Sequence, residues 1–405
     1  MRVLVLHNRY RELGGEDAVA NSEVQLLRRN GVEVRFINPG NEADPRVDLR
    51  GALALAFDSH WSRRQYDSIR ALCREFRPHV AHVHNFWMRL TPAVHAACRD
   101  ENVPTVQTLH NFRLFCANAQ FQRNGHKCQD CLGRTPWRGV WLRCYRHSFL
   151  ASASVVRMIA TNRARKTWTE QVSAFICVSE HARRLSVAGG IPEERIQVKP
   201  NFVEDRGLPR TPPSASNVFL LVGRLSAEKG VSSLLQAWKA ADLNGEARLL
   251  IAGDGPLRSE LEREAVRIGI QDSVSFTGFL ARDRVLSLLG DARAIIIPSL
   301  FHECFPRVLV ESMSAGRPLI ASNVGALDEL VESDIGLQFE AGDPERMAEA
   351  IRRLWRDPGQ ADRFGRAARA RYLERYTPEH NFEALMKIYD FAMGRQEHCS
   401  LGATA

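Results

Sequence analysis

Short apolar runs alternate with longer amphipathic segments along the whole chain. In the first half, apolar runs of strand-like composition occupy residues 3–6, 32–37, 80–83, 105–107, 175–178 and 196–199. Segments with helical spacing of apolar positions lie between them, over residues 17–29, 62–76, 92–98 and 147–171. Strands that alternate with helices predict a parallel, doubly wound sheet.

The second half repeats this pattern. Its predicted strands occupy residues 218–222, 248–252, 274–276, 294–297 and 319–321, and a helical pattern follows each. A chain of 405 residues is more easily packed as two such domains than as one. The segment 204–217 contains three prolines and is the predicted linker. We therefore predict an α/β protein with Rossmann-like domains over residues 1–204 and 205–375, followed by a helix over 376–394.

Two carboxylates follow the predicted strand 294–297. Glu303 lies in the loop after this strand, and Glu311 lies in a helix that begins near Pro306. Proline is tolerated in a first helical turn, because its missing N–H has no partner there. A helix start beside a carboxylate is suited to hold a phosphate and a sugar.

Two further segments follow strands of the same predicted sheet. Arg224 and Lys229 come just after strand 218–222, and Gly253 and Gly255 come just after strand 248–252. Open α/β sheets bind ligands at the carboxyl ends of their strands. Two cations, glycine turns through which backbone approaches a ligand, and a helix N-terminus together predict a diphosphate site.

At these positions the chain resembles the donor-binding half of glycosyltransferase family 4, which are retaining enzymes of the GT-B fold. The resemblance covers residues 217–340. It is carried by Gly-Arg-Leu-x-x-Glu-Lys-Gly, Gly-Asp-Gly-Pro, Glu-x7-Glu and Ala-Gly-x-Pro-Leu-Ile-Ala-Ser, in the family's order. Gly325-Ala326 departs from the family's usual Gly-Gly, and this departure narrows the space expected beside the donor phosphate.

The resemblance implies two domains facing across a cleft, a UDP- or GDP-sugar as donor and no catalytic metal. Arg224 and Lys229 would neutralise the leaving diphosphate, and Glu311 would accept hydrogen bonds from the ribose. Glu303 would bind the donor sugar, without serving as a covalent nucleophile. The acceptor hydroxyl would attack on the face from which the leaving group departs.

The first domain offers further candidates. The resemblance implies that the Gly15 amide faces the diphosphate or the acceptor, whereas the alternative is an ordinary turn between strand and helix. Glu16 is expected to cap the following helix. His110 follows a strand, and the resemblance implies that it contacts the donor sugar or the acceptor hydroxyl; the alternative is a structural histidine. His84 is a second candidate.

Four cysteines lie within a predicted insertion over residues 111–147. The set includes a Cys-x2-Cys pair, which is consistent with a structural zinc ion. Its members are Cys116, Cys128, Cys131 and Cys144. Unligated cysteines or a redox-sensitive pair are the alternatives. A capsule and exopolysaccharide subset of the family resembles the chain here. Nine cysteines in all agree with a reducing compartment, so we predict a cytoplasmic protein.

The net charge of +8 is unevenly placed. Residues 111–166 hold 11 basic side chains and one acidic side chain. An anionic lipid, a lipid-diphosphate acceptor or nucleic acid would match this charge, and an arginine-rich surface without a role is the alternative. The apolar and basic segment around Trp168 suits either a membrane interface or a helix packed on its own sheet. No segment approaches the ~20 apolar residues of a membrane span.

The resulting prediction is a hexosyltransferase of surface polysaccharide or glycoconjugate synthesis, peripheral to the inner face of the membrane. A lipid-linked saccharide is the expected acceptor. The alternatives are a GT-B epimerase or phosphorylase, a zinc-bearing nucleic-acid-binding protein, and a scaffold without activity. No reading helix or aromatic ladder supports nucleic-acid binding.

Overall fold

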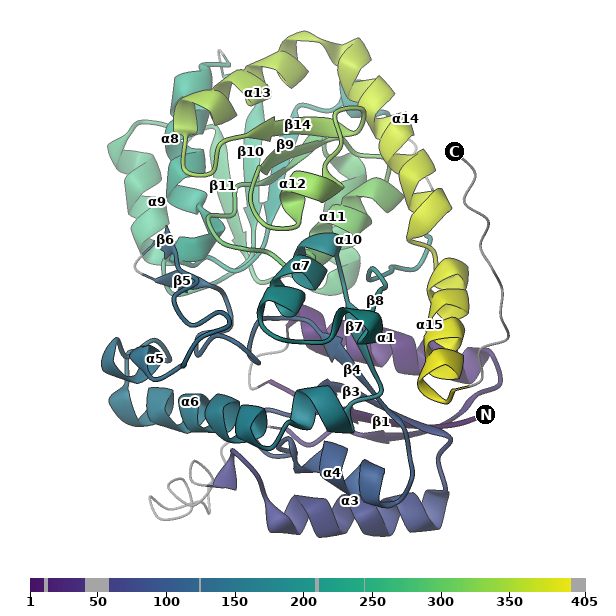
Figure 1. The fold of residues 1–405 in the computed structure, drawn as a ribbon. Coiled ribbons are helices and arrows are strands. Elements are labelled where there is room, and N and C mark those ends of the chain that lie inside the picture. Colours follow the sequence, from purple (N-terminus) through teal and green to yellow (C-terminus); the bar gives the residue numbers. More distant parts are fainter. Residues whose placement is uncertain (11–13, 41–57, 124, 208–210, 244, 395–405) are drawn as a thin grey trace. The chain divides into compact units, whose positions relative to one another are not determined.

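The computed structural model describes residues 1–10, 14–40, 58–123, 125–207, 211–243 and 245–394 (Figure 1). The chain forms two compact units. The first contains residues 1–120, 129–200 and those from 379 onward, and the second contains residues 121–128 and 201–378.

The first unit is built on a six-stranded parallel sheet with strand order β2-β1-β3-β4-β7-β8. Its strands are β1 (Arg2–His7), β2 (Glu33–Ile37), β3 (Val80–Asn85), β4 (Thr105–Leu109), β7 (Ala174–Cys177) and β8 (Ile196–Val198). The order reverses beside β1, so the carboxyl ends of β1 and β3 border the switch point of the sheet.

Helices cover both faces of this sheet. The helices of this unit are α1 (Gly15–Arg29), α3 (Arg63–Phe76), α4 (Ala93–Asp100), α5 (Arg138–Trp141), α6 (Phe149–Ala164), α7 (Glu180–Ala188) and α15 (Pro378–Ala392). Helices α1 and α15 share one apolar core with the sheet, while α3 and α4 lie on its opposite side (Figure 1). Helix α15, the last helix of the described residues, is thus part of the first unit.

The second unit has a parallel sheet with strand order β11-β10-β9-β12-β13-β14. Its strands are β9 (Val218–Val222), β10 (Arg248–Ala252), β11 (Val274–Gly278), β12 (Ala294–Ile297), β13 (Leu319–Ser322) and β14 (Gly336–Phe339). Its helices are α8 (Val231–Ala241), α9 (Arg258–Arg267), α10 (Arg282–Asp291), α11 (Arg307–Ser314), α12 (Leu327–Leu330), α13 (Pro344–Arg356) and α14 (Pro358–Arg375). The hairpin of β5 (Gln122–Arg123) and β6 (His126–Lys127) groups with this unit.

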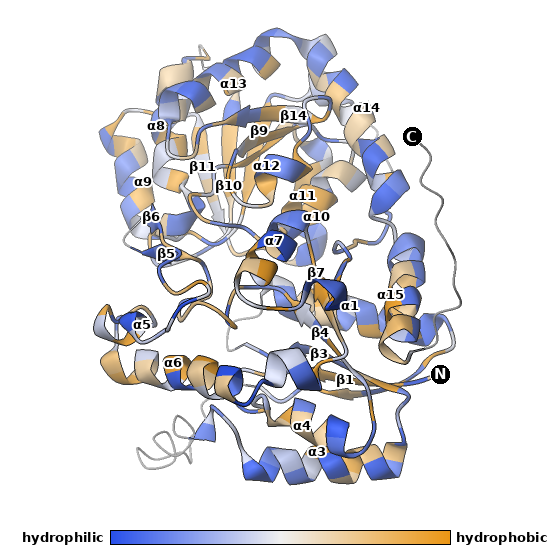
Figure 2. Ribbon diagram, in the orientation of Figure 1, coloured by the Kyte–Doolittle hydropathy of each residue, from blue (hydrophilic) through white to orange (hydrophobic). Residues whose placement is uncertain are grey.

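The sequence explains these elements locally. The central strands are apolar almost throughout, as in sheets that are buried on both faces, whereas the surrounding helices mix polar and apolar residues (Figure 2). Helix α13 begins at Pro344 after Asp343, whose carboxylate accepts hydrogen bonds from two amides of the first turn.

The predicted class, two doubly wound α/β halves, is confirmed. Some boundaries differ. The units change at residue 200 rather than 204, and part of the predicted insertion, residues 121–128, groups with the second unit. The helix predicted over 147–171 is wrong in length, because Lys166 adopts a left-handed conformation and a separate π-helical turn follows (Thr167–Gln171). None of the described helices has the length and apolar character to cross a bilayer.

Candidate functional site

The sheet of the second unit also reverses its order, between β9 and β12. The loop after β9 carries Lys229, and the loop after β12 carries Glu303. Ligands of open α/β sheets bind outside the strand ends at such a switch point. Two of the residues predicted from sequence therefore lie where this architecture places a binding site.

Lys229 and Glu303 form an ion pair between these loops. The Lys229 ammonium donates to Glu303 Oε1 over 2.5 Å, and Ser299 Oγ donates to the same oxygen over 2.8 Å. The Lys229 nitrogen also lies 5.0 Å from the ring centroid of Phe301. The Glu303 side chain is 10% exposed and that of Lys229 28%. A half-enclosed cation and carboxylate, fixed by charge-assisted hydrogen bonds, can bind a phosphate and a sugar hydroxyl side by side.

Backbone contacts fix the spacing of the two loops. The Leu300 amide donates to the Glu228 carbonyl over 2.8 Å. Gly230 has φ +69°, and a Cβ there would lie 2.0 Å from the Pro298 carbonyl oxygen. Only glycine permits this approach, so the sequence Lys229-Gly230 positions the lysine against the second loop.

Gly253 and Gly255 have a packing role that the sequence did not reveal. A Cβ on Gly253 would lie 1.8 Å from the Gly223 carbonyl oxygen, and one on Gly255 would lie 2.4 Å from the Leu225 carbonyl oxygen. The Leu225 amide donates to the Asp254 carbonyl over 2.9 Å. These glycines allow the loop after β10 to pack closely against the loop after β9. Arg224 lies in that second loop, and its side chain is exposed. Their contact with a ligand stays a prediction.

Gly325 holds the backbone of Glu303. It has φ +64°, and a Cβ there would lie 2.8 Å from the Glu303 amide nitrogen and carbonyl oxygen. The next amide, of Ala326, donates to the Glu303 carbonyl over 2.9 Å. Ala326 itself has φ −72°, a conformation in which a side chain is unstrained. The departure from Gly-Gly is therefore compatible with the loop.

Glu311 is held by two arginines that the sequence analysis did not single out. Its Oε1 lies 3.2 Å from Arg307 Nη2 and 3.5 Å from Arg282 Nη2. Burial lowers the pKa of Arg307, and Glu311 opposes that effect. Arg307 precedes Glu311 by four residues on α11, a spacing that brings side chains together and was a usable signal. A cavity of about 570 Å³ borders Glu311, Arg282, Leu286 and Ser314, a size suited to a small-molecule ligand.

In the first unit, His110 follows β4 and contacts His84 of β3. Their Nε2 and Nδ1 atoms are 3.0 Å apart, and the two rings are stacked with an interplanar angle of 12°. Burial lowers the pKa of both histidines, that of His84 well below its usual range. Both of the histidines that the sequence proposed are thus neutral near pH 7 and lie in one hydrogen-bonded pair.

The start of α1 corrects one expectation. Glu16 does not cap the helix: its carboxylate accepts from Asn111 Nδ2 over 2.5 Å. Asp17 takes the capping role, accepting from the Gly14 amide over 2.8 Å and from His7 Nε2 over 2.9 Å. Its position three residues after Gly14 matches a capping box, which was the missed signal. Gly15 is exposed at the first helical turn, and a Cβ there would have open space around it to at least 4 Å.

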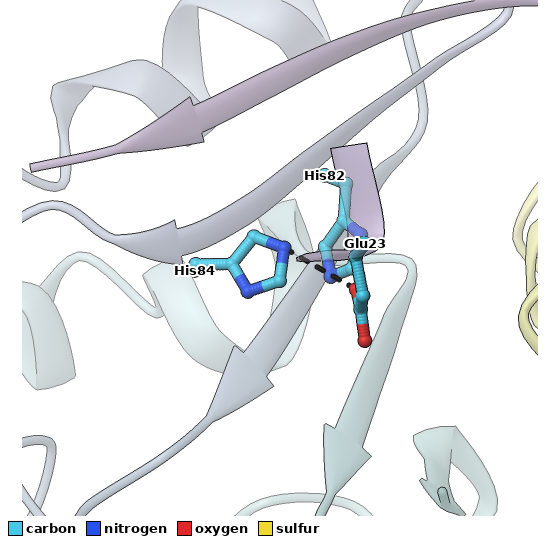
Figure 3. A group of neighbouring side chains, drawn as sticks. All are labelled: Glu23, His82 and His84. Carbon is cyan, nitrogen blue, oxygen red and sulfur yellow. Dashed lines mark ion pairs between the residues drawn. The ribbon is translucent and has the colours of Figure 1, made fainter. Parts of the chain in front are cut away.

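Glu23, His82 and His84 are the group of described residues that lies close enough to hold a metal ion (Figure 3). Their other contacts do not suit a cation. Both nitrogens of His82 are occupied, by Tyr389 Oη at 2.8 Å and Thr108 Oγ1 at 2.7 Å. The Lys199 ammonium also donates to Glu23, and a second cation beside it would be repelled. We interpret the group as a polar network.

The four cysteines of the predicted zinc site do not form such a group within the described part of the chain. The Cys116 thiol donates to Asn118 Oδ1 over 2.9 Å, and Cys131 Sγ lies 4.0 Å from the Pro136 carbonyl oxygen. The thiols of Cys116, Cys128, Cys131 and Cys144 form no disulfide. The zinc site therefore stays a prediction without structural support.

Each half of the chain matches the model of a known protein family. The family model "Glycosyltransferase Family 4" matches residues 13–206, and the model "Glycosyl transferases group 1" matches residues 209–371. The first falls on most of the first unit and the second on most of the second unit.

Two curated relatives align with less than half of the chain. The alpha-D-kanosaminyltransferase of Streptomyces kanamyceticus is 32% identical over 176 residues, which are 42% of this chain and 45% of that protein. The GDP-mannose-dependent alpha-(1-6)-phosphatidylinositol dimannoside mannosyltransferase of Mycobacterium tuberculosis is 38% identical over 151 residues, 37% of this chain and 38% of that protein. The chain thus spans less than half the length of either relative.

A solved structure matches nearly the whole chain. The structure of Anabaena Alr3699/HepE in complex with UDP has a TM-score of 0.67 and 17% sequence identity, and the match covers 96% of this chain and 99% of that chain. At this identity the likeness shows the fold, which is GT-B as the resemblance implied.

Proposed function

Because this chain belongs to the family 4 type of glycosyltransferases, we propose that it transfers a sugar from a nucleoside-diphosphate sugar to an acceptor hydroxyl, with retention at the anomeric carbon. The observation that carries the proposal is the Lys229–Glu303 pair at the switch point of the second sheet. A cation for the leaving diphosphate and a carboxylate for the sugar lie together there.

The charged site residues of the second unit each have a role in this proposal. Lys229 and Arg224 stabilise the negative charge that develops on the diphosphate as the glycosidic bond breaks. The N-terminus of α11 adds the positive end of its dipole. Glu303 accepts hydrogen bonds from the donor sugar and stabilises positive charge at the anomeric carbon. The carboxylate of Glu311, oriented by its arginines, accepts hydrogen bonds from the ribose hydroxyls.

The donor carries UDP or GDP, and the reaction needs no divalent metal, because side chains and helix dipole neutralise the diphosphate. Both nucleotides occur among the similar proteins: one solved structure holds UDP, and one relative is named as GDP-mannose-dependent. Gly15 and His110 belong to the acceptor side of the reaction in this proposal.

The acceptor is a lipid-linked saccharide in polysaccharide or glycoconjugate synthesis. One relative is named as a phosphatidylinositol dimannoside mannosyltransferase, and the lipid-linked saccharide in that name supports a lipid acceptor. Such an acceptor requires the enzyme to reach a membrane surface.

An exposed aromatic and basic surface on the first unit supports membrane contact. Trp141 is 77% exposed and Leu150 70%, and the Trp141 ring lies 6.2 Å from that of Phe149. The neighbouring Arg143 and Arg146 are exposed as well. Tryptophan prefers the headgroup region of a bilayer, and arginines are attracted to anionic lipids. We propose that α5 and the start of α6 dock on an anionic membrane.

Isothermal titration calorimetry with UDP, GDP and their sugar conjugates tests the donor site, with and without EDTA. We expect one nucleotide to bind regardless of chelator, and Lys229→Ala to weaken it by at least about 10-fold through loss of a charge-assisted contact. Lys239→Ala is the matched control, since this exposed lysine lies on α8 outside the loops. Equal binding by both variants would remove Lys229 from the donor site.

Vesicle flotation tests the membrane surface. We expect the protein to float with vesicles containing phosphatidylglycerol, and the pair of changes Trp141→Ser and Leu150→Ser to abolish flotation. Val266→Ser, an exposed apolar position on α9, is the control. Flotation that survives the pair of changes would refute the assignment of this surface.

A further inference from the structure

His110 and His84 share one hydrogen bond, so one of the two nitrogens must carry the hydrogen. His110 Nε2 and His84 Nδ1 are 3.0 Å apart. If His84 Nδ1 is protonated, its Nε2 bears a lone pair; if His84 Nε2 is protonated, His110 must be the donor. The surroundings of His84 Nε2 therefore decide which tautomer His110 adopts.

Glu23 supplies those surroundings. Its Oε2 lies 3.4 Å from His84 Nε2, and both side chains are almost fully buried, at 2% and 0% exposure. Neither of these two atoms has a hydrogen-bond partner in the described part of the chain. A lone pair on His84 Nε2 would face a carboxylate oxygen at this distance and be repelled, whereas an N–H would be attracted. The proton of His84 is therefore favoured on Nε2.

Lys199 keeps Glu23 ionised. Its ammonium donates to Glu23 Oε1, and both side chains are buried. Burial opposes ionisation of Glu23, yet the pKa of its carboxyl is lowered because Lys199 and His84 favour the charged form. Asn381 of α15 accepts a hydrogen bond from Lys199 over 3.3 Å. A buried ion pair contributes little net stability in general, so the Glu23–Lys199 pair calls for a role other than stabilisation.

We propose that Glu23 is a positioning residue that acts through His84 to hold His110 as a neutral imidazole with its proton on Nε2. Nδ1 of His110 is then a hydrogen-bond acceptor for a substrate hydroxyl. The opposite tautomer would present a donor at the same place. The role of the hydroxyl rests on the proposed function, which places His110 at the acceptor; the tautomer itself does not.

Long-range 1H–15N correlation spectra of the protein with 15N-labelled histidine test the tautomers at neutral pH, because protonated and bare ring nitrogens have distinct shifts. His84→Gln and His110→Gln assign the signals. We expect both His84 and His110 to carry the proton on Nε2. A proton on Nδ1 of His110 in the unsubstituted protein would overturn the proposal.

The double variant Glu23→Gln/Lys199→Met removes both buried charges together, so neither is left alone. A glutamine can turn its oxygen or its amide nitrogen toward His84, so we expect the His84 and His110 signals to show mixed tautomers. We expect kcat to fall at least about 10-fold with KM for the donor changed less than about 2-fold, since the donor residues are untouched. Tyr389→Phe, which removes only the hydrogen bond to His82, is the matched control and should leave both readouts unchanged.

The outcomes separate this inference from the proposed function. Unchanged tautomers with unchanged kcat in the double variant refute the role of Glu23. Tautomers as proposed in a protein that transfers no sugar count against the proposed function alone.

Discussion

Acid should destabilise this protein in part through one histidine with no part in the proposed reaction. His95 lies on α4 with 0% exposure, packed edge-on against Phe86 and Trp168. Neither ring nitrogen has a hydrogen-bond partner among the described residues. Burial lowers the pKa of His95 to about 4. The Gln107 side chain acts in the opposite direction and raises this pKa by a smaller amount.

The sign of the effect follows from proton uptake. The folded pKa lies below the unfolded value of ~6.5, so the unfolded chain binds more protons as the pH falls from about 6.5 toward 4. The stability from a neutral His95 is complete above pH ~6.5 and is lost as the pH approaches the folded pKa. Between pH 7 and pH 5 the loss amounts to about 2 kcal/mol for this one residue.

His95→Phe and His95→Leu remove the titration and keep an apolar side chain in the same packing. Urea unfolding followed by circular dichroism at pH 7 and pH 5 measures the result. We expect the unsubstituted protein to lose about 2 kcal/mol more than either variant between these pH values. The other buried histidines cancel in this comparison. An equal loss in all three proteins would refute the assignment of a neutral, desolvated His95.

Three further changes test other parts of the molecule. Glu311→Gln should weaken nucleotide binding about 10-fold, because a charged hydrogen bond is worth ~1.5–3 kcal/mol. Free nucleobases, which have no ribose, should bind the variant and the unsubstituted protein equally well. Calorimetry with nucleotide and free base measures this, and an equal loss for both ligands would contradict the ribose contact. Gly255→Ala should destabilise the protein by about 1–3 kcal/mol through overpacking against Leu225, whereas Gly15→Ala, with open space around it, should not; equal thermal midpoints would refute the packing role. The zinc prediction is tested by elemental analysis of the purified protein: zinc should be present, and it should be lost in Cys128→Ser/Cys131→Ser. A folded protein without zinc would refute the prediction.

The sequence predicts the strands of the second half closely because each apolar run stops at a turn-forming residue. The runs 218–222, 248–252 and 294–297 coincide with β9, β10 and β12, followed by Gly223, Gly253 and Pro298. By contrast, β14 was missed, since its four residues Gly336–Phe339 include a glycine and a glutamine at a sheet edge.

The residues of the candidate site were likewise predicted only in part. Lys229 and Glu303 were predicted from motifs, but their contact depends on strand order, because 74 residues separate them. Glu23 and Lys199 were missed for a different reason. Charged residues in a helix or at a strand end are usually exposed, and the sequence does not show that α15 packs on the first sheet and places Asn381 against Lys199.

The most direct test of the proposed function is sugar transfer itself. Purified protein is incubated with UDP- and GDP-sugars and lipid-linked saccharide acceptors, in EDTA, and the product and its anomeric configuration are determined by NMR. The proposal predicts a retained configuration from one donor, lost in Glu303→Gln and in Lys229→Ala while Lys239→Ala remains active. Inverted product, release of free sugar without an acceptor, a requirement for inorganic phosphate, or full activity in Glu303→Gln would contradict it.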